Sequence, residues 1–192
     1  AAGAFDQNIN TNLAVDGNGV SYTAWDVSNV TDMERMFAGA FTFNRSLNSW
    51  DVSNVTNMDH MFFQSVAFNS DISSWNTISV ITMEGMFLDA LIFNGDITSW
   101  NTSSVESMRD MFSNAEAFDQ NIATHSVTNT NGTYNAWNTS IVDDMSNMFN
   151  GADVFNRDLS SWTVSQVTGC TDFDLNATAW VLSKPTFTSC TI

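Results

Sequence analysis

The oxygen-bearing side chains are the residues of this sequence best suited to chemistry, because calcium prefers clustered Asp, Asn and backbone oxygens. Asp16-Gly17-Asn18-Gly19 has that composition, although it lacks the full EF-hand pattern. A second candidate is a column of acids at one repeat position: Asp71, Asp96 and Asp158, with Ser46 and Asn121 in the remaining places. We therefore expect calcium in the loop or along the column. The alternative is that these acids are solvated turn residues.

Catalysis is not indicated by the same residues. His60 lies at a variable repeat position and His125 in an insertion, and no nucleophile elbow, zinc motif or phosphate loop is present. The carboxylates recur with the repeat, so a pair of acids is no evidence for glycosidase chemistry. We expect that the protein is not an enzyme.

A polar surface is expected beside the tryptophans, where small and polar residues alternate with apolar ones. Such a face could hydrogen-bond to a glycan or a protein, and its uniformity also fits a structural spacer. An exposed face must in any case be polar. The candidate ligand residues on this face are Asp26, Asp51, Asn76, Asn101 and Asn138.

Two cysteines, Cys170 and Cys190, lie near the C-terminal end of a chain rich in Ser, Thr and Asn. Their position predicts a disulfide in an oxidising compartment, the alternative being two buried free thiols. The chain begins inside a repeat and shows no signal peptide, so we expect a mature fragment of an extracellular or cell-surface protein.

The net charge excludes some partners. The formal charge is −16, with five basic residues in 192. Five basic groups cannot neutralise a phosphate backbone, and nucleic acid is therefore not an expected partner. No apolar run is long enough to insert into a membrane. Cations, glycans and proteins stay open, and the oligomeric state is undetermined.

An internal repeat of about 25 residues organises the chain. Tryptophans at 25, 50, 75, 100, 137 and 162 are spaced by 25, 25, 25, 37 and 25 residues, and the wide interval contains an insertion. A similar insertion precedes Trp25. All ten methionines occur as Met-x-x-Met pairs, each followed by Phe; the pairs begin at Met33, Met58, Met83, Met108 and Met145.

Each repeat predicts one helix and one strand. Met58, Met61, Phe62 and Ser65 lie at i, i+3, i+4 and i+7, which is one helical face. Thr31 with Glu34, and Thr56 with Asp59, are typical of capping boxes. In residues 47–52, apolar and polar residues alternate with the period of a strand. The repeats therefore predict an α/β solenoid, a leucine-rich-repeat-like right-handed superhelix of short parallel strands and short helices.

One further column should connect the repeats. An amide or carboxylate follows the second Phe of each repeat, at Asn44, Asn69, Asn94, Asp119 and Asn156. We predict that it forms a ladder that hydrogen-bonds the turn backbone between coils, with ligand binding as the alternative. Residues 1–24 are expected to be a partial repeat with an insertion loop, 25–169 tandem repeats, and 170–192 a disulfide cap, all in one domain.

The motifs W-D-V-S-N-V-T-[DN]-M and M-F-x-x-A-x-x-F-N resemble the repeats of BspA-like leucine-rich-repeat surface proteins, which are also described as a Mycoplasma-type lipoprotein domain of unknown function. The C-terminal W-V-L-S-K-P-T-F-T-S-C resembles the usual end of such arrays. The two insertions, and Ile81 in place of a threonine, depart from the pattern. The resemblance implies a secreted or surface location, a role in adhesion or recognition, and no catalytic residues.

Two functions follow from these observations. The first is an extracellular recognition or adhesion module that binds a glycan or protein through a repeat surface and is stabilised by calcium. The alternative is a rigid spacer within a larger surface protein, without a ligand of its own.

Overall fold

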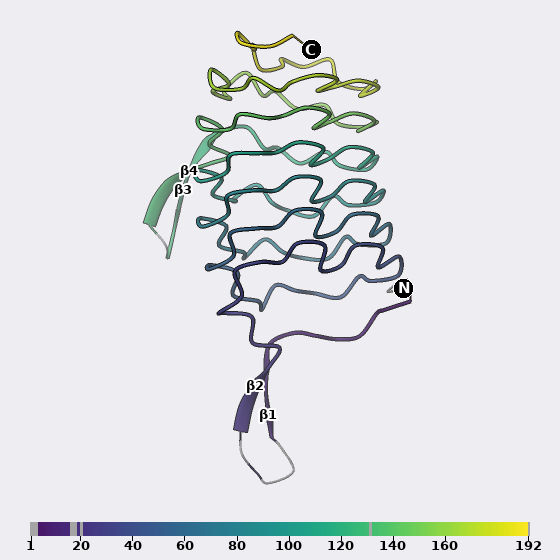
Figure 1. Ribbon diagram of the computed structural model, residues 1–192, viewed down its shortest axis with the longest axis vertical. Coiled ribbons are helices and arrows are strands. Elements are labelled where there is room, and N and C mark those ends of the chain that lie inside the picture. The colour runs from purple at the N-terminus through teal and green to yellow at the C-terminus, as the bar shows by residue number, and fades with distance from the viewer. Residues whose placement is uncertain (1–3, 16–18, 20, 131, 192) are drawn as a thin grey trace.

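The chain winds into a stack of coils. The structure is a computed structural model that describes residues 4–15, 19, 21–130 and 132–191. Backbone hydrogen bonds join each coil to the next at residues 24 to 26 apart, or 36 or 37 apart across the insertion. Figure 1 shows the coils lying one above another from the N-terminal to the C-terminal end.

The expected α/β solenoid of leucine-rich-repeat type is wrong. No helix is present among the residues that the structure describes, and residues 47–52 form a turn in place of a strand, with the Trp50 N–H donating to the Leu47 carbonyl (3.0 Å). The named strands are β1 (Asn12–Val15), β2 (Ser21–Ala24), β3 (His125–Asn129) and β4 (Gly132–Ala136). They pair as two antiparallel hairpins, β1–β2 and β3–β4, within the segments expected to be insertion loops.

Residues in the left-handed conformation explain why the methionine segments are not helical. His60 lies between Met58 and Met61 with φ of 55°, and Gln64 has φ of 56°. A left-handed residue cannot continue a right-handed helix, so the chain forms consecutive turns, such as the one closed by the Met61 N–H on the Met58 carbonyl (3.2 Å). The equivalent left-handed residues are Arg35, Gly85, Asp110, Asn147 and Asp172 at the first position, and Gly39, Asp89, Asn114, Gly151 and Asn176 at the second. The expected capping boxes are therefore wrong as well.

The turns leave alternate N–H groups free to bond the next coil. Met58 donates to the Thr82 carbonyl (3.1 Å), His60 to Glu84 (2.7 Å) and Phe62 to Met86 (2.9 Å). Coils also meet through single parallel bridges, which run Asp32–Asn57, Asn57–Thr82, Thr82–Ser107, Ser107–Asp144 and Asp144–Gly169. Backbone polar groups that a helix would satisfy internally are thus satisfied between coils.

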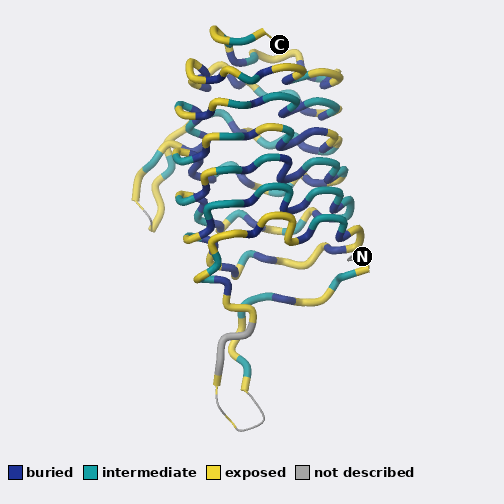
Figure 2. The backbone as a smooth tube through the Cα atoms, in the orientation of Figure 1, coloured by how far each residue is buried: buried dark blue, intermediate teal, exposed yellow. Residues whose placement is uncertain are grey.

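Stacked aromatic rings fill the inside of the coils. Figure 2 shows that buried residues recur in coil after coil along the stack. Phe62 stacks on Phe68 of its own coil (3.9 Å between ring centroids) and on Phe87 of the next coil (5.6 Å). Trp75 stacks on Trp100 (6.1 Å) in a parallel column. Of the ten methionines, nine are buried and Met36, in the first coil, is 43% exposed. The methionine and phenylalanine columns therefore form the core, as the sequence predicted.

Each tryptophan after Trp25 also donates a hydrogen bond from its indole N–H to a carbonyl of the preceding coil. The pairs are Trp50–Ile9 (2.8 Å), Trp75–Leu47 (3.0 Å), Trp100–Ile72 (3.4 Å), Trp137–Ile97 (2.9 Å), Trp162–Ile122 (2.8 Å) and Trp180–Arg157 (2.9 Å). A buried indole N–H needs such a partner, and here that partner fixes the spacing of two coils.

The predicted ladder of amides is confirmed. The Asn44 Oδ1 accepts from the Asn69 N–H (2.8 Å), and the Asn69 Oδ1 accepts from the Asn94 N–H (2.8 Å). The same bond continues through Asp119 and Asn156 at 3.0 Å each. The column thus connects coils along the stack without requiring a ligand.

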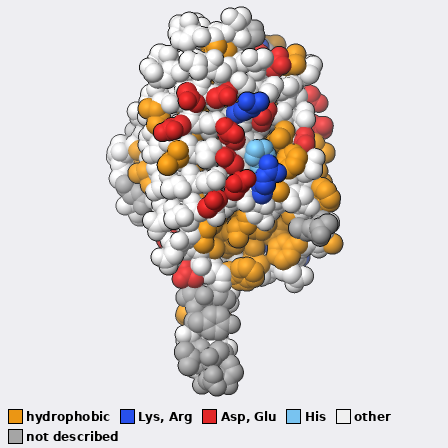
Figure 3. Space-filling model, viewed as in Figure 1, with side chains coloured by type: hydrophobic (Ala, Val, Ile, Leu, Met, Phe, Trp, Pro, Cys, Tyr) orange, Lys and Arg blue, Asp and Glu red, His pale blue; other side chains and the backbone are white. Residues whose placement is uncertain are grey.

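Charged side chains lie on the outside of the stack. Figure 3 shows acidic side chains in a band across several coils, with basic and histidine side chains among them. Arg109 contacts Asp110 (3.2 Å) and Asp144 (3.9 Å) from a half-exposed position. Exposed pairs of this kind contribute about 0–1 kcal/mol each, so the core and the backbone bonds dominate stability.

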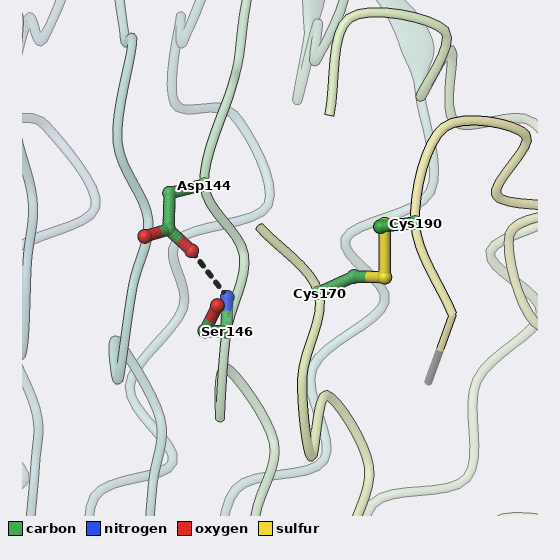
Figure 4. Close-up of a disulfide and its surroundings, with 4 residues drawn as sticks. All are labelled: Asp144, Ser146, Cys170 and Cys190. Carbon is green, nitrogen blue, oxygen red and sulfur yellow. Dashed lines mark hydrogen bonds between the residues drawn. A yellow bond between two sulfur atoms is a disulfide. The ribbon is translucent and has the colours of Figure 1, made fainter. Parts of the chain in front are cut away.

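The C-terminal end of the stack is covered by the last residues of the chain. A disulfide joins Cys170 to Cys190 across a Cα–Cα distance of 6.0 Å (Figure 4). Phe187 packs edge-on against Phe173 (5.0 Å), and Lys184 pairs with Asp174. The first cysteine takes the place of a core methionine, so the bond closes directly over the buried column.

Replacing a methionine by aspartate should destabilise the protein strongly at a buried position of one methionine column and only weakly at its exposed end. We expect Met86→Asp to cost more than about 4 kcal/mol and to abolish cooperative unfolding, because it places a charge among fully buried side chains. Met36→Asp, at the exposed end of the same column, should cost about 1 kcal/mol or less. Urea unfolding followed by tryptophan fluorescence measures both, and equal losses would contradict the assignment of the core.

The amide ladder predicts a second pair of variants. Asn94→Ala removes the acceptor for the Asp119 N–H and the Gln120 side chain, and should cost about 1 kcal/mol. Asn94→Asp keeps an acceptor oxygen, as Asp119 does naturally, and should retain most of that stability. If urea unfolding shows the same loss for both variants, the acceptor is not what the column supplies.

Candidate functional site

The β3–β4 hairpin interrupts the regular surface of the stack. Its base is fixed by Thr124, whose N–H donates to the Ser161 Oγ (3.0 Å) and whose hydroxyl donates to the Trp137 carbonyl (2.7 Å). The β1–β2 hairpin uses the same anchor, since the Thr11 N–H donates to the Ser49 Oγ (2.9 Å) and its hydroxyl to the Trp25 carbonyl (3.0 Å). Figure 1 shows β3 and β4 leaving the stack and running alongside the earlier coils.

Tyr134 holds the β3–β4 hairpin against these coils. Its hydroxyl donates to the Ser99 carbonyl (2.6 Å) and accepts from the Asn129 Nδ2 (3.2 Å). Burial raises the pKa of the Tyr134 phenol above its ordinary value, so the group stays a neutral donor at physiological pH. The hairpin is therefore placed by a specific hydrogen bond as well as by its base.

A polar cavity of about 230 Å³ lies between the hairpin and the coils. Among the described residues, no charged side chain lines it, and the walls carry hydroxyl, amide and aromatic groups. Ser74, Asn76, Ser99 and Asn101 come from the coils, and Asn129 and Tyr134 come from the hairpin. Its volume is below the roughly 300–1,000 Å³ of drug-sized ligand pockets, so it can enclose one small polar unit of a ligand and not a whole drug-sized molecule.

The sequence-predicted ligand residues are only partly brought together. Asn76 and Asn101 line the cavity, whereas Asp26, Asp51 and Asn138 do not. Each of the five accepts a hydrogen bond at Oδ1 from the N–H two residues later, at 3.0, 3.0, 3.4, 3.1 and 3.1 Å for Asp26, Asp51, Asn76, Asn101 and Asn138. Their shared role is to shape a turn, and Asn101 is itself buried.

The acid column serves a similar turn. The Asp71 Oδ1 accepts from the Ser73 N–H (2.9 Å) and hydroxyl (2.7 Å), and its Oδ2 accepts from the Asn48 Nδ2 (2.8 Å). The two bonds from Ser73, the backbone one first, lower the pKa of Asp71. The hydroxyl and the N–H of Ser160 lower the pKa of Asp158 in the same way.

Two members of that column, Asn121 and Asp158, line an open hollow of about 450 Å³ beside the base of the β3–β4 hairpin. Arg157 lines it as well and pairs with Asp119 (2.6 Å). The positive charge of the Arg157 guanidinium disfavours the binding of a cation at this end of the column. Asp71, Asp96 and the hydroxyl of Ser46 do not line it.

The structure leaves the calcium prediction untested. Within the part of the chain that the structure describes, no three His, Cys, Asp or Glu side chains form a group that could hold a metal ion. The loop candidates Asp16 and Asn18 lie outside the described residues. Calcium stays a prediction.

The two histidines have local partners. The His60 ring lies against the left-handed Gly85, where a Cβ would come within 2.7 Å of the His60 Nε2, and it meets Phe63 edge-on. The His125 Nδ1 lies 2.9 Å from the Ala123 carbonyl.

The sequence reasoning missed Asn129 and Tyr134. Their signal was the segment 129–132, which is rich in the Asn and Gly typical of hairpin turns and is flanked by residues that alternate like strands. That pattern predicts a hairpin, but not the direction in which the hairpin leans. The cavity depends on that direction.

Comparison with known proteins defines the family. The chain matches the family described as Mycoplasma protein of unknown function, DUF285, over residues 2–125 and 125–188, and it belongs to that family. No curated protein and no solved structure gave a match. Among the residues described here, none forms a helix that could cross a membrane.

Calcium should be tested against ionic strength. If a site binds only the folded chain, calcium at ten times Kd stabilises it by about 1.4 kcal/mol, and extracellular sites commonly have Kd near 10⁻⁴–10⁻³ M. We expect a higher Tm in millimolar calcium than in sodium chloride of equal ionic strength, reversed by a chelator. Asp16→Asn and Asp96→Asn then separate loop from column, since the true ligand loses the increment. Equal Tm values in the two salts would show that the acids are merely solvated.

Proposed function

We propose that this protein is a recognition module of a cell surface or secreted protein, and that it binds a neutral glycan at the cavity beneath the β3–β4 hairpin. The chemistry of the cavity supports a sugar. Hydroxyl and amide groups converge from two directions, and the absence of lining charge disfavours ions and charged peptides.

The observation that carries the proposal is the break in repetition. The stack alone offers a uniform polar surface, which gives a ligand no preferred position. The β3–β4 hairpin adds an aromatic ring and an amide at one place, at Tyr134 and Asn129. A hairpin held there by the hydrogen bond from Tyr134 to Ser99 creates one site along an otherwise repeating surface.

The surface location rests on separate arguments. The Cys170–Cys190 disulfide suits an oxidising compartment, and a charge of −16 favours solubility and repels acidic surfaces. The resemblance of the repeats to those of BspA-like surface proteins supports the same location and an adhesive role. Calcium would then act as a stabiliser and not as part of the glycan site.

A rigid spacer is the second candidate function. The continuous aromatic columns and the amide ladder favour it, because they stiffen the whole length of the stack without requiring a ligand. In that case the hairpin would be only a surface insertion.

Glycan-array binding followed by calorimetry tests the proposal. We expect Thr130→Trp to abolish binding of a neutral glycan, because Thr130 lines the cavity and the indole would fill it. Asn76→Ala should weaken binding about fivefold, the equivalent of one hydrogen bond of roughly 1 kcal/mol.

Ser126→Trp is the matched control, since Ser126 is exposed on the same hairpin and does not line the cavity. It should leave binding unchanged. Loss of binding in all three variants would place the ligand elsewhere on the hairpin. No glycan binding in the unmodified protein would favour the spacer, or a protein partner.

A further inference from the structure

The turns that follow the tryptophans are closed by one oxygen atom of an Asp or Asn side chain. Asp26 and Asp51 close this turn with a carboxylate Oδ1, and Asn76 and Asn101 close the equivalent turn with an amide Oδ1. A backbone N–H needs only an oxygen acceptor, which both side-chain types provide. The turn therefore does not explain why these coils differ in the second polar atom of the side chain, which is Oδ2 in Asp and Nδ2 in Asn.

The two amides that line the cavity leave that second atom without a protein partner. Asn76 and Asn101 both line the cavity, and no described residue accepts a hydrogen bond from the Nδ2 of either. Asn101 is only 6% exposed. Among the described residues, no side-chain nitrogen or oxygen is both sealed from solvent and unpaired. The Asn101 Nδ2 therefore keeps its access through the cavity, where an acceptor can reach it.

These two amides come from consecutive coils that lie side by side. The Thr77 hydroxyl donates to the Asn101 carbonyl (2.9 Å), which holds the coil of Asn76 against the coil of Asn101. Hydrogen-bonded neighbouring chains lie about 4.8 Å apart. A single oxygen atom between the two amides can therefore accept from both, and a carbonyl oxygen has two lone pairs with which to do so.

Two serine hydroxyls of the cavity act as acceptors toward a ligand. The Ser74 Oγ donates to the Asn48 carbonyl (2.6 Å), and the Ser99 Oγ donates to the Ser73 carbonyl (3.3 Å). Because a hydroxyl has one proton, each of these oxygens offers a ligand only its lone pairs. The coil side of the cavity thus combines two amide donors with two hydroxyl acceptors.

Aromatic rings give the same cavity an apolar wall. Trp75 lines it from the coils, and Tyr134 lines it from β4. The Tyr134 hydroxyl already donates to the Ser99 carbonyl (2.6 Å), so Tyr134 contributes mainly its ring to a ligand. A small apolar group is favourably removed from water against such a ring.

We propose that the cavity binds the acetamido group of an N-acetylated amino sugar, an inference that rests on the proposed glycan-binding function and names the sugar. The acetamido carbonyl accepts from the Nδ2 atoms of Asn76 and Asn101. Its N–H donates to a serine Oγ, and its methyl group packs on the aromatic wall. A hydroxyl in the same place on an unmodified sugar has one polar atom in place of two, and it has no methyl group.

Paired glycans test this inference. An array should hold oligosaccharides of N-acetylglucosamine and N-acetylgalactosamine beside glucose and galactose oligosaccharides of the same linkage and length, all of them uncharged. Calorimetry then gives the affinity of the best pair. We expect the N-acetylated member to bind at least about tenfold more tightly, because it makes at least two hydrogen bonds that its counterpart lacks.

Substitution by aspartate separates the amide donor from the turn. Asn76→Asp keeps the Oδ1 that closes the turn, as Asp51 does naturally, and replaces Nδ2 by a negative oxygen that repels the acetamido carbonyl. We expect it to abolish the preference for the N-acetylated probe, and Asn101→Asp to do the same. Because Asn76 is more exposed than Asn101, Asn76→Asp keeps the test available if a charge at Asn101 prevents folding.

Asn138→Asp is the matched control, since Asn138 closes the same turn in a coil whose amide does not line the cavity. It should leave the preference intact. Equal affinity for the two members of each pair would overturn the inference and leave the glycan site in place. A preference that survives Asn76→Asp would also overturn it, because the acetamido group would then lie elsewhere. If no glycan binds at all, the proposed function fails and the inference fails with it.

Discussion

Hydrogen bonds between successive coils are the interaction on which this structure depends, and they exist because each coil contains two left-handed residues. A residue such as His60 or Gln64 turns the chain so that every second N–H points along the stack. The donors then meet the carbonyls of the next coil, and the side chains between them face inward. Packing of Met and Phe follows from that backbone geometry.

The sequence predicts the content of the core better than its backbone. Met58, Met61, Phe62 and Ser65 are all fully buried, as their spacing indicated. Consecutive turns, however, bury the same i, i+3, i+4 and i+7 positions that a helix buries, so periodicity alone could not distinguish them. The distinguishing signal was the residue type at the two left-handed positions, where Asn, Asp and Gly predominate.

The candidate site was predictable in part. Asn76 and Asn101 were recognised as polar positions on one face, but their role in closing turns is shared by every repeat and therefore marks no site. What marks the site is Tyr134, whose bond to Ser99 spans 35 residues of sequence. The acid column likewise owes its regularity to turns, because Asp71 and Asp158 accept hydrogen bonds from residues two positions ahead.

The near-identity of the contacts between coils has a mechanical consequence. Under tension along the chain, the equivalent backbone bonds of the regular coils should resist by similar amounts, so these coils should detach one at a time. Each coil contains about 25 residues, so a coil that is fully extended would span roughly 80–90 Å. Near the C-terminus, the Cys170–Cys190 bond prevents the segment that it encloses from being extended. The stack would thus lengthen in steps of similar size and stop at the segment that the disulfide encloses.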